Sequence, residues 1–132
     1  ISLDFCLYFL AHFCIKTLKS NKKILIIIQR SNGDVLLASN LISELLKFKK
    51  FKLVSIDNYS SGLTKNHIKN KKVRYLKGST KNIEILLKNY VGKIYTIFHF
   101  GEFARIYQSF KKIDECFSSN IEGSSSVFNF AI

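Results

Sequence analysis

The sequence predicts an α/β fold with about four parallel strands and flanking helices. Short, continuous apolar runs rich in branched residues, such as Lys23 to Ile28, are typical of strands that are buried on both faces of a sheet. These runs alternate with segments such as Val35 to Phe48, in which apolar residues recur at helical spacing. Strands that alternate with helices imply right-handed crossovers and therefore a parallel sheet.

The first half of the chain is expected to supply two strands and one helix. The strand from Lys23 to Ile28 is followed by a polar turn, Gln29 to Asp34, which contains one glycine. The helix from Val35 to Phe48 has one broad apolar face and leads to a second strand, Leu53 to Ile56. A polar loop with room for one helical turn then covers Tyr59 to Asn70.

The second half repeats the alternation. Ser79 or Thr80 can cap a helix that Gly92 ends, because short polar side chains accept from the free N–H groups of a first turn. The other expected elements are a third strand over Val73–Leu76, a fourth strand over Lys93–Phe100, and a helical region from about Phe110 to Ile132, interrupted near Ser118 to Ser126.

Composition narrows the class of protein. The 132 residues suit one domain, and a hydrophobic content of 47% excludes a disordered chain. The formal net charge of +12 favours polyanions as partners, although the lysines are spread along the whole chain. The 3 cysteines lack C-x-x-C spacing, so neither a disulfide framework nor a zinc site is expected, and a reducing, cytoplasmic compartment follows.

Residues 1–21 are expected to form an apolar leader, separate from the domain over residues 22–132. The apolar run Phe5 to Ile15 is shorter than the ~20 residues that a membrane span needs. Its cations, Lys16 and Lys19, follow the run, whereas a signal peptide has them before it. An extra helix, a poorly folded leader and a signal remnant all stay open.

Asp57 is the first candidate for a binding residue. It ends the apolar run of the second strand and precedes a turn, Asn58 to Gly62. A carboxylate in this place holds the ribose hydroxyls of a dinucleotide in many βαβ units. The alternative is a turn-forming role, since Asp and Asn both favour turns.

Three further segments complete a pattern. They are Lys77-Gly78-Ser79, the stretch from Ile97 to Glu102, and Asn120 to Gly123. Together with Asp57, and over about residues 22–132, they resemble the nucleotide-sugar epimerase/dehydratase branch of the extended short-chain dehydrogenases.

The resemblance implies a partial Rossmann-like sheet with strand order 3-2-1-4, NAD as cofactor and a nucleotide sugar as substrate. It implies no catalytic residue and no metal site in this stretch of chain. The cofactor-binding positions that it implies are Gly33, Asp57, Asn58, Ser79, His99 and Gly101.

The sequence departs from the family at the glycine loop. In the family, three glycines let the backbone approach the pyrophosphate, and here Asn32, Val35 and Ala38 stand at those positions. The turn also looks too long, with Ile27 to Arg30 in excess, and Ser79 replaces an acidic residue that holds the adenine amino group in many members. We therefore expect NAD binding to be weak or lost.

Catalysis by this chain alone is not expected. The family's Tyr-x-x-x-Lys lies beyond the segment that the resemblance covers, and the spacing found at Tyr107 and Lys111 precedes Asn120, which is the wrong place. His99 ends a buried strand, so a structural histidine is favoured over an acid–base role.

Two other functions remain open on the sequence alone. The run Lys47 to Lys52 interleaves phenylalanine with lysine, as single-strand nucleic-acid binders do. A solvated helix end gives the same pattern. An incomplete sheet would also leave an exposed edge for another protein or for self-association.

Overall fold

The computed structural model describes residues 24–29, 32–60, 64–103 and 106–132 of the chain. The expected leader, residues 1–21, lies outside the described residues. Arg30, the last of the residues by which the first turn was expected to be longer than in the family, also lies outside the described residues.

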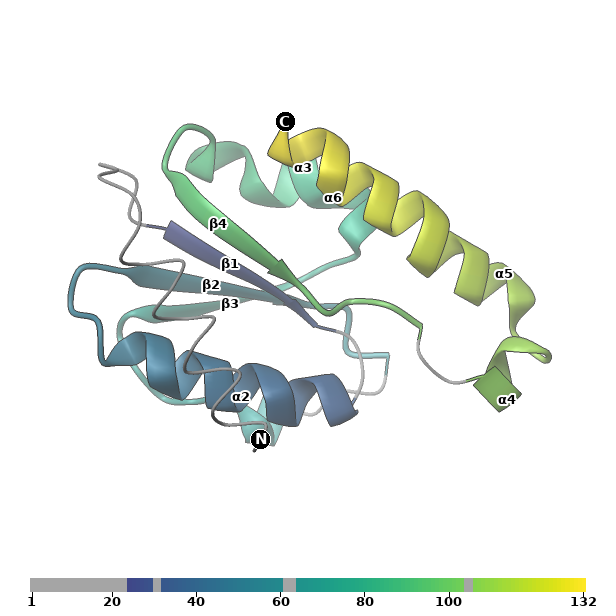
Figure 1. Cartoon of the computed structure of the whole chain (residues 1–132), viewed down its shortest axis with the longest axis horizontal. Coiled ribbons are helices and arrows are strands. Elements are labelled where there is room, and N and C mark those ends of the chain that lie inside the picture. The colour runs from purple at the N-terminus through teal and green to yellow at the C-terminus, as the bar shows by residue number, and fades with distance from the viewer. Residues whose placement is uncertain (1–23, 30–31, 61–63, 104–105) are drawn as a thin grey trace, which may run out of the picture.

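The fold is α/β with a parallel sheet at its centre (Figure 1). The strands are β1 (Ile24–Gln29), β2 (Lys52–Asp57), β3 (Val73–Lys77) and β4 (Ile94–His99). They lie in the order β3-β2-β1-β4, and every neighbouring pair is parallel. The α/β class and the parallel pairing agree with a partial Rossmann-like fold.

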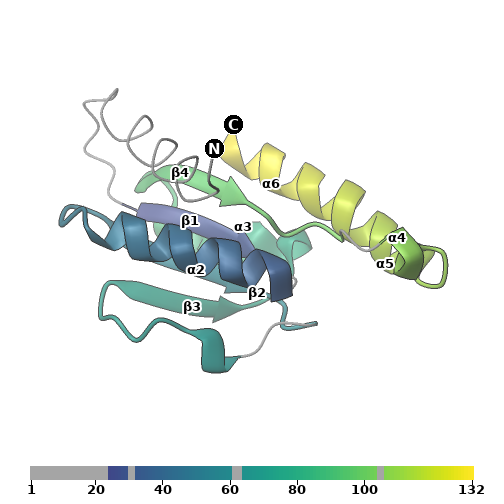
Figure 2. The same cartoon turned by 60° about the horizontal axis from the view of Figure 1, so that its bottom comes forward.

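Helices cover both faces of the sheet. Helix α2 (Asn32–Leu46) lies along one face, and α3 (Ile83–Leu87) and α6 (Ser124–Ala131) lie along the other (Figures 1 and 2). The remaining elements are α4 (Ile106–Ser109), α5 (Ile113–Phe117), the 3-10 turns η1 (Thr64–Asn66), η2 (Thr80–Asn82) and η3 (Lys88–Tyr90), and the π-helical turn η4 (Ser118–Gly123). No helix in the described part of the chain is long and apolar enough to cross a membrane.

Strand β2 is buried on both faces, as its apolar run predicts. Its Leu53 packs beneath α2 with Leu41 and Leu45. Val54, next along the strand, joins Ile26 of β1 and residues of α3 and α6 on the opposite face. Successive side chains of a strand point to opposite faces, so β2 contributes to two cores.

Helix α2 starts earlier than the sequence predicts. It begins at Asn32 rather than Val35, and β1 extends through Gln29. Gln29 lies in β1 and Asn32 to Asp34 lie in α2, so the prediction of a polar turn from Gln29 to Asp34 was wrong. Ile27 to Gln29, which the resemblance left in excess, pair with β2 as regular strand residues. Gly33 suggested a turn, but a glycine is tolerated in a first helical turn where nothing else stops the helix.

The C-terminal region is a continuous helical run rather than an interrupted one. Ser118–Gly123 form a π-helical turn between α5 and α6, where the serines predicted a break. Serine weakens a helix because its hydroxyl competes for backbone groups. Here the side chains of Ser119, Asn120 and Ser124 bond to the end of β4 and to the loop after it, as described below.

Gly123 allows η4 to approach η2. A Cβ atom built at this glycine would overlap Oγ1 of Thr80, which is itself buried. The contact joins the C-terminal helical run to the segment that follows β3. The close approach explains a glycine inside a helix, where it otherwise costs stability.

Gly123→Ala should lower the free energy of unfolding by about 1–2 kcal/mol, because overpacking outweighs the gain in helix propensity. In a Thr80→Ala background the same change should be neutral or stabilising, since Oγ1 is gone. Urea denaturation of both single variants and the double variant measures the coupling. Ser125→Ala, at an exposed position of α6, is the control. Equal losses in both backgrounds would contradict the contact.

Candidate functional site

A cavity of about 120 Å³ lies where the four strands end. Parallel strands bring their carboxyl ends to one edge of the sheet, which is where ligands bind in open α/β folds. The wall contains residues from β1, from the turns after β2, β3 and β4, and from the C-terminal helical run: Ile28, Ile56, Asn58, Gly78, Ser79, Thr80, Gly101, Glu115, Ser118 and Ser119. Three of the predicted cofactor positions, Asn58, Ser79 and Gly101, thus share one cavity.

Asp57 lies at the end of β2, beside that cavity, and is only 2% exposed. Its Oδ1 accepts the N–H of Tyr59 at 2.8 Å, and Tyr59 has a positive φ of 56°. Asn58 forms a similar turn, with its Oδ1 accepting the N–H of Ser60 at 2.9 Å. These bonds are the turn role that the sequence offered as an alternative.

Asp57 also acts on the tyrosine to which it is bonded. Burial first, and the negative charge of Asp57 second, raise the pKa of the Tyr59 phenol above its usual value. A carboxylate can accept several hydrogen bonds, so the turn bond from Tyr59 does not by itself exclude a bond from a ribose hydroxyl.

The segment after β3 is held close to the end of β2. The N–H of Gly78 donates to the carbonyl of Asp57 at 3.0 Å, and Ser79 Oγ accepts the N–H of Lys81 at 3.4 Å. A Cβ atom at Gly78 would come within 2.5 Å of Leu86 Cδ1. A side chain at this position would displace Leu86, so the glycine favours close packing against α3 whether or not a ligand binds.

Gly101 begins the loop after β4 and is buried against β1. A Cβ atom there would come within 2.7 Å of Ile28 Cγ2. Its N–H donates to Nδ1 of His99 at 3.2 Å, and its carbonyl accepts from Ser119 Oγ at 3.3 Å. Gly101 therefore brings the β4 loop against the end of β1.

His99 bonds to the protein on both ring nitrogens. Nδ1 accepts from Gly101, so in the neutral ring Nε2 carries the proton and donates to Ser124 Oγ at 3.0 Å. Burial lowers the pKa of the imidazole, and the nearby Glu102 carboxylate opposes that shift. The ring does not line the cavity, and this bonding fits the structural role predicted for it.

Asn120 clamps the same loop. Its Oδ1 accepts the N–H of Phe103 at 2.5 Å, and its Nδ2 donates to the carbonyl of Phe103 at 3.1 Å. Both bonds go to one backbone residue, so the side chain fixes the loop in position and orientation. The sequence pointed to Asn120 only through the family resemblance and gave no reason for its role.

The π-helical turn explains how Ser119 and Ser124, five residues apart, both reach the end of β4. Residues 119 and 124 would lie about 140° apart around an α-helix, since each residue advances by ~100°. A π turn bonds residues five apart and so aligns them. Ser119 and Ser124 therefore both face the end of β4, where they bond to Gly101 and His99.

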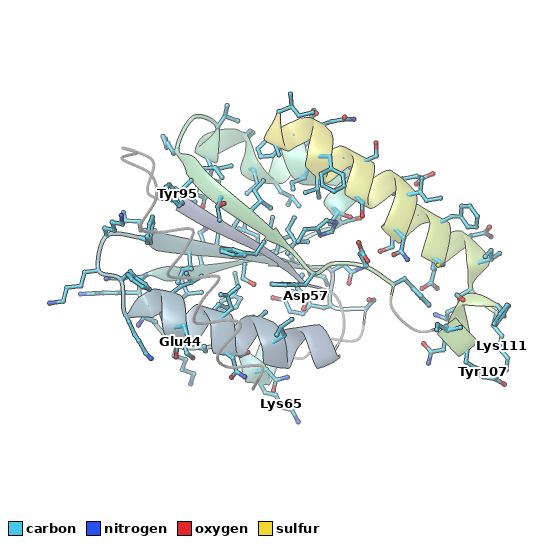
Figure 3. The ribbon with its side chains drawn as sticks, in the orientation of Figure 1. Glu44, Asp57, Lys65, Tyr95, Tyr107 and Lys111 are labelled. Atoms are coloured by element: carbon cyan, nitrogen blue, oxygen red, sulfur yellow. The ribbon has the colours of Figure 1, made fainter. Side chains whose placement is uncertain are left out.

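Other residues singled out in the sequence lie elsewhere. Gly33 is in the first turn of α2. Tyr107 is 75% exposed, and its ring contacts the ammonium group of Lys111, whose Nζ is 5.3 Å from the ring centroid. Figure 3 shows this pair at α4, away from Asp57. Neither residue of the pair lines the cavity.

The aromatic residues of the Lys47–Lys52 run face the core. Phe51 is 2% exposed, and Phe48 packs against the same core cluster beneath α2. Lys47 forms an ion pair with Glu44 at 2.7 Å. Phe51 is therefore not exposed for base stacking, and Phe48 keeps only part of its ring surface.

The cavity is small, and its described wall carries no cation. A volume of about 120 Å³ is well below the ~300 Å³ at which drug-sized ligand pockets begin. Among the described residues of the wall the one charged side chain is Glu115, and an acidic side chain disfavours phosphate. Where the resemblance predicts glycines, Asn32–Leu46 form a helix and Ala38 is fully buried in helix packing.

The stability of the chain should fall as pH drops below about 6.5, the usual pKa of a free histidine. The folded pKa of His99 is lowered, so the unfolded state binds more protons in this window, and protonation favours unfolding. His99→Gln should flatten this dependence, because it removes the titrating ring and keeps an amide that can hydrogen-bond to Ser124. Melting temperatures between pH 7.5 and pH 5.5 test the claim. Ser126→Ala is the control, since Ser126 bonds only to its own helix at Glu122, and an identical slope in both variants would contradict it.

Two solved structures share this fold. No protein-family model and no curated protein matches the chain. An epimerase from Methanothermobacter thermautotrophicus superimposes with a TM-score of 0.67 and 16% identity, covering 98% of this chain and 35% of its own. A UDP-glucose 4-epimerase from Thermotoga maritima, solved with UDP-glucose, gives a TM-score of 0.67 and 18% identity, covering 82% of this chain and 33% of its own. The chain thus has an epimerase-like fold and spans about a third of the length of each.

Proposed function

We propose that this chain forms the NAD-binding part of an epimerase-like nucleotide-sugar enzyme and holds the adenosine end of the cofactor more strongly than its pyrophosphate. The observation that carries the proposal is the shared cavity at the carboxyl ends of the strands, with Asp57 beside it. The fold shared with two epimerase structures supports it.

Each residue has a distinct task in this proposal. The Asp57 carboxylate accepts hydrogen bonds from ribose hydroxyls, while the turn to Tyr59 keeps it in place. Asn58 and Ser79, which both line the cavity, offer an amide and a hydroxyl to the sugar or the base. His99 and Gly101 act indirectly, by fixing the β4 loop that closes the wall.

Bound NAD would supply the hydride chemistry, and the protein would supply position. The described residues that surround the cavity include no Tyr-x-x-x-Lys pair. We therefore propose that this stretch binds cofactor and does not itself catalyse a reaction. A nucleotide sugar would be the substrate of the whole enzyme, by analogy with the neighbour that was solved with UDP-glucose. We place the protein in the cytoplasm, on the cysteine pattern alone.

The natural chain should bind NAD only weakly. Helix α2 begins at Asn32, and β-branched Val35 stands where a glycine normally lets the backbone approach phosphate. Isothermal titration calorimetry of the whole chain should therefore give no saturable heat at micromolar protein. A micromolar dissociation constant would contradict this prediction and the assignment of the glycine positions.

Glycine at Asn32, Val35 and Ala38 together should raise the affinity for NAD. Each substitution weakens the helix by up to about 1 kcal/mol, so a circular dichroism melt must first show that the triple variant is folded. A matched triple variant with alanine at Asn32, Val35 and Ser39 keeps the helix and offers no approach to phosphate. Equal affinities in the two triple variants would show that the loop is not the limiting feature.

In the triple-glycine background, Asp57→Ala should weaken NAD binding by about 1.5–3 kcal/mol, or roughly 10- to 150-fold, because charge-assisted bonds to two hydroxyls are lost. Glu84→Ala, at an exposed position of α3, controls for the change in charge. Chemical-shift titration with adenosine distinguishes the ends of the cofactor. An affinity unchanged by Asp57→Ala would leave the residue with only its turn role.

A further inference from the structure

Tyr59, in the turn after β2, has a backbone conformation that a large side chain does not favour. Its φ is 56°, and in the described part of the chain it is the one residue other than glycine with a positive φ. The left-handed region brings Cβ close to the following carbonyl oxygen, which costs free energy for every residue but glycine. A tyrosine in this conformation therefore needs contacts that hold it there.

The two residues before Tyr59 depend on its conformation. The N–H of Tyr59 donates to Oδ1 of Asp57 at 2.8 Å, and the N–H of Ser60 donates to Oδ1 of Asn58 at 2.9 Å. A change in φ of Tyr59 turns its own N–H relative to the chain that follows, so the two bonds would not both keep their geometry. Asp57 ends β2 beside the cavity, and Asn58 is part of the cavity wall.

His67 holds the side chain of Tyr59. The Tyr59 hydroxyl and Nε2 of His67 are 3.0 Å apart and share a hydrogen bond, and the two ring centroids are 5.8 Å apart. His67 comes directly after η1, and its N–H donates to the carbonyl of Thr64 at 3.0 Å. The imidazole therefore ties η1 to the turn that carries Asp57.

Tyr75 of β3 holds His67 in turn. The two rings are stacked, with centroids 3.7 Å apart and an angle of 3° between their planes. The Tyr75 hydroxyl also accepts the N–H of Ile68 at 2.9 Å, and the backbone of Tyr75 pairs with Ser55 of β2. Burial is the main cause that raises the pKa of the phenols of Tyr59 and Tyr75, so both hydroxyl groups keep their protons at neutral pH. A continuous series of contacts thus joins the sheet to Tyr59.

We infer that His67 is a positioning residue, which holds Tyr59 in the left-handed conformation and thereby fixes Asp57 and Asn58 at the edge of the cavity. His67 is not among the described residues that line this cavity, so it acts through Tyr59. Its effect on the turn follows from these contacts alone. Its effect on a ligand rests on the proposed function, in which Asp57 accepts hydrogen bonds from ribose hydroxyls.

The first test is NMR spectroscopy of the natural chain and of His67→Phe, each first shown to be folded by a cooperative melt. Phenylalanine keeps a ring that can stack on Tyr75 but offers no partner to the Tyr59 hydroxyl. The Tyr59 N–H should then exchange with solvent at least about threefold faster, as expected for the loss of one neutral hydrogen bond. The coupling constants that report φ of Tyr59 should move towards right-handed values. His67→Gln, whose amide can replace Nε2 as a hydrogen-bonding group, should restore most of the natural values.

The second test measures NAD affinity in the triple-glycine background. His67→Phe should weaken binding by about three- to tenfold, the range for one neutral hydrogen bond. Tyr59→Phe removes the other half of the same bond and should have an equal effect, and the double variant should be no weaker than either single variant. Asn66→Ala, at an exposed neutral position next to His67, is the control and should change nothing.

Tyr59→Gly separates positioning from a general effect on stability. Glycine adopts the left-handed conformation without a steric cost, so the turn should form without His67. In this background, His67→Phe should change neither the exchange rate of the N–H at position 59 nor the affinity for NAD.

The outcomes distinguish this inference from the proposed function. An unchanged exchange rate and φ of Tyr59 in His67→Phe would overturn the inference, whatever the affinity. The same conclusion would follow if His67→Phe weakened binding equally with tyrosine and with glycine at position 59, because the effect would then not pass through Tyr59. A turn that loosens in His67→Phe while NAD affinity stays constant would uphold the role of His67 in the turn and contradict the ribose contact of Asp57.

Discussion

The position of β1 between β2 and β4 is the constraint on which the rest of the structure depends. A strand with parallel neighbours on both sides must be apolar on both faces, and Ile24–Gln29 meets this with five aliphatic residues in succession. The crossovers that parallel pairing demands place α2 on one face and α3 and α6 on the other. The same pairing aligns the ends of all four strands. The residues that follow β2, β3 and β4 therefore meet in space although they are far apart in the sequence. The position of the cavity is thus set by the strand topology, and its side chains determine only its shape and polarity.

Local turn chemistry then shapes that edge. Asp57 and Asn58 bond to the backbone two residues ahead, and Ser119, Asn120 and Ser124 bond across to the chain around the end of β4. These bonds lie within the protein, so the walls of the cavity do not depend on a bound ligand. Helix α2, in contrast, begins at Asn32, in the stretch where the sequence resemblance predicts a glycine-lined turn. The cofactor proposed above would therefore meet an ordered cavity wall at one end and a helix at the other.

The sequence predicts the parts of this structure that depend on hydrophobic periodicity, and it misses those that depend on contacts distant along the chain. The α/β class and the central strands follow from apolar runs such as Ile24 to Ile28, whose β-branched residues have few other uses. The start of α2 was misplaced because Gly33 is equally compatible with a turn and a first helical turn. The serine-rich stretch after Phe117 looked like a break in the helix. The partners of its hydroxyl groups, Gly101 and His99, lie 18 and 25 residues earlier in the sequence, so local reasoning could not find them. Similarly, Phe48 and Phe51 resembled a basic, aromatic surface until the fold placed both rings beneath α2.

The π-helical turn from Ser118 to Gly123 lets the chain accommodate one residue more than a regular helix would hold. Deleting one residue between Ser119 and Ser124 would leave the two serines four positions apart, a spacing that an α-helix also brings to one face. Both serines would then still face Gly101 and His99. The extra residue is therefore absorbed by the π turn and is not itself required for the two serine contacts, so a helix one residue shorter here is compatible with the same sheet edge.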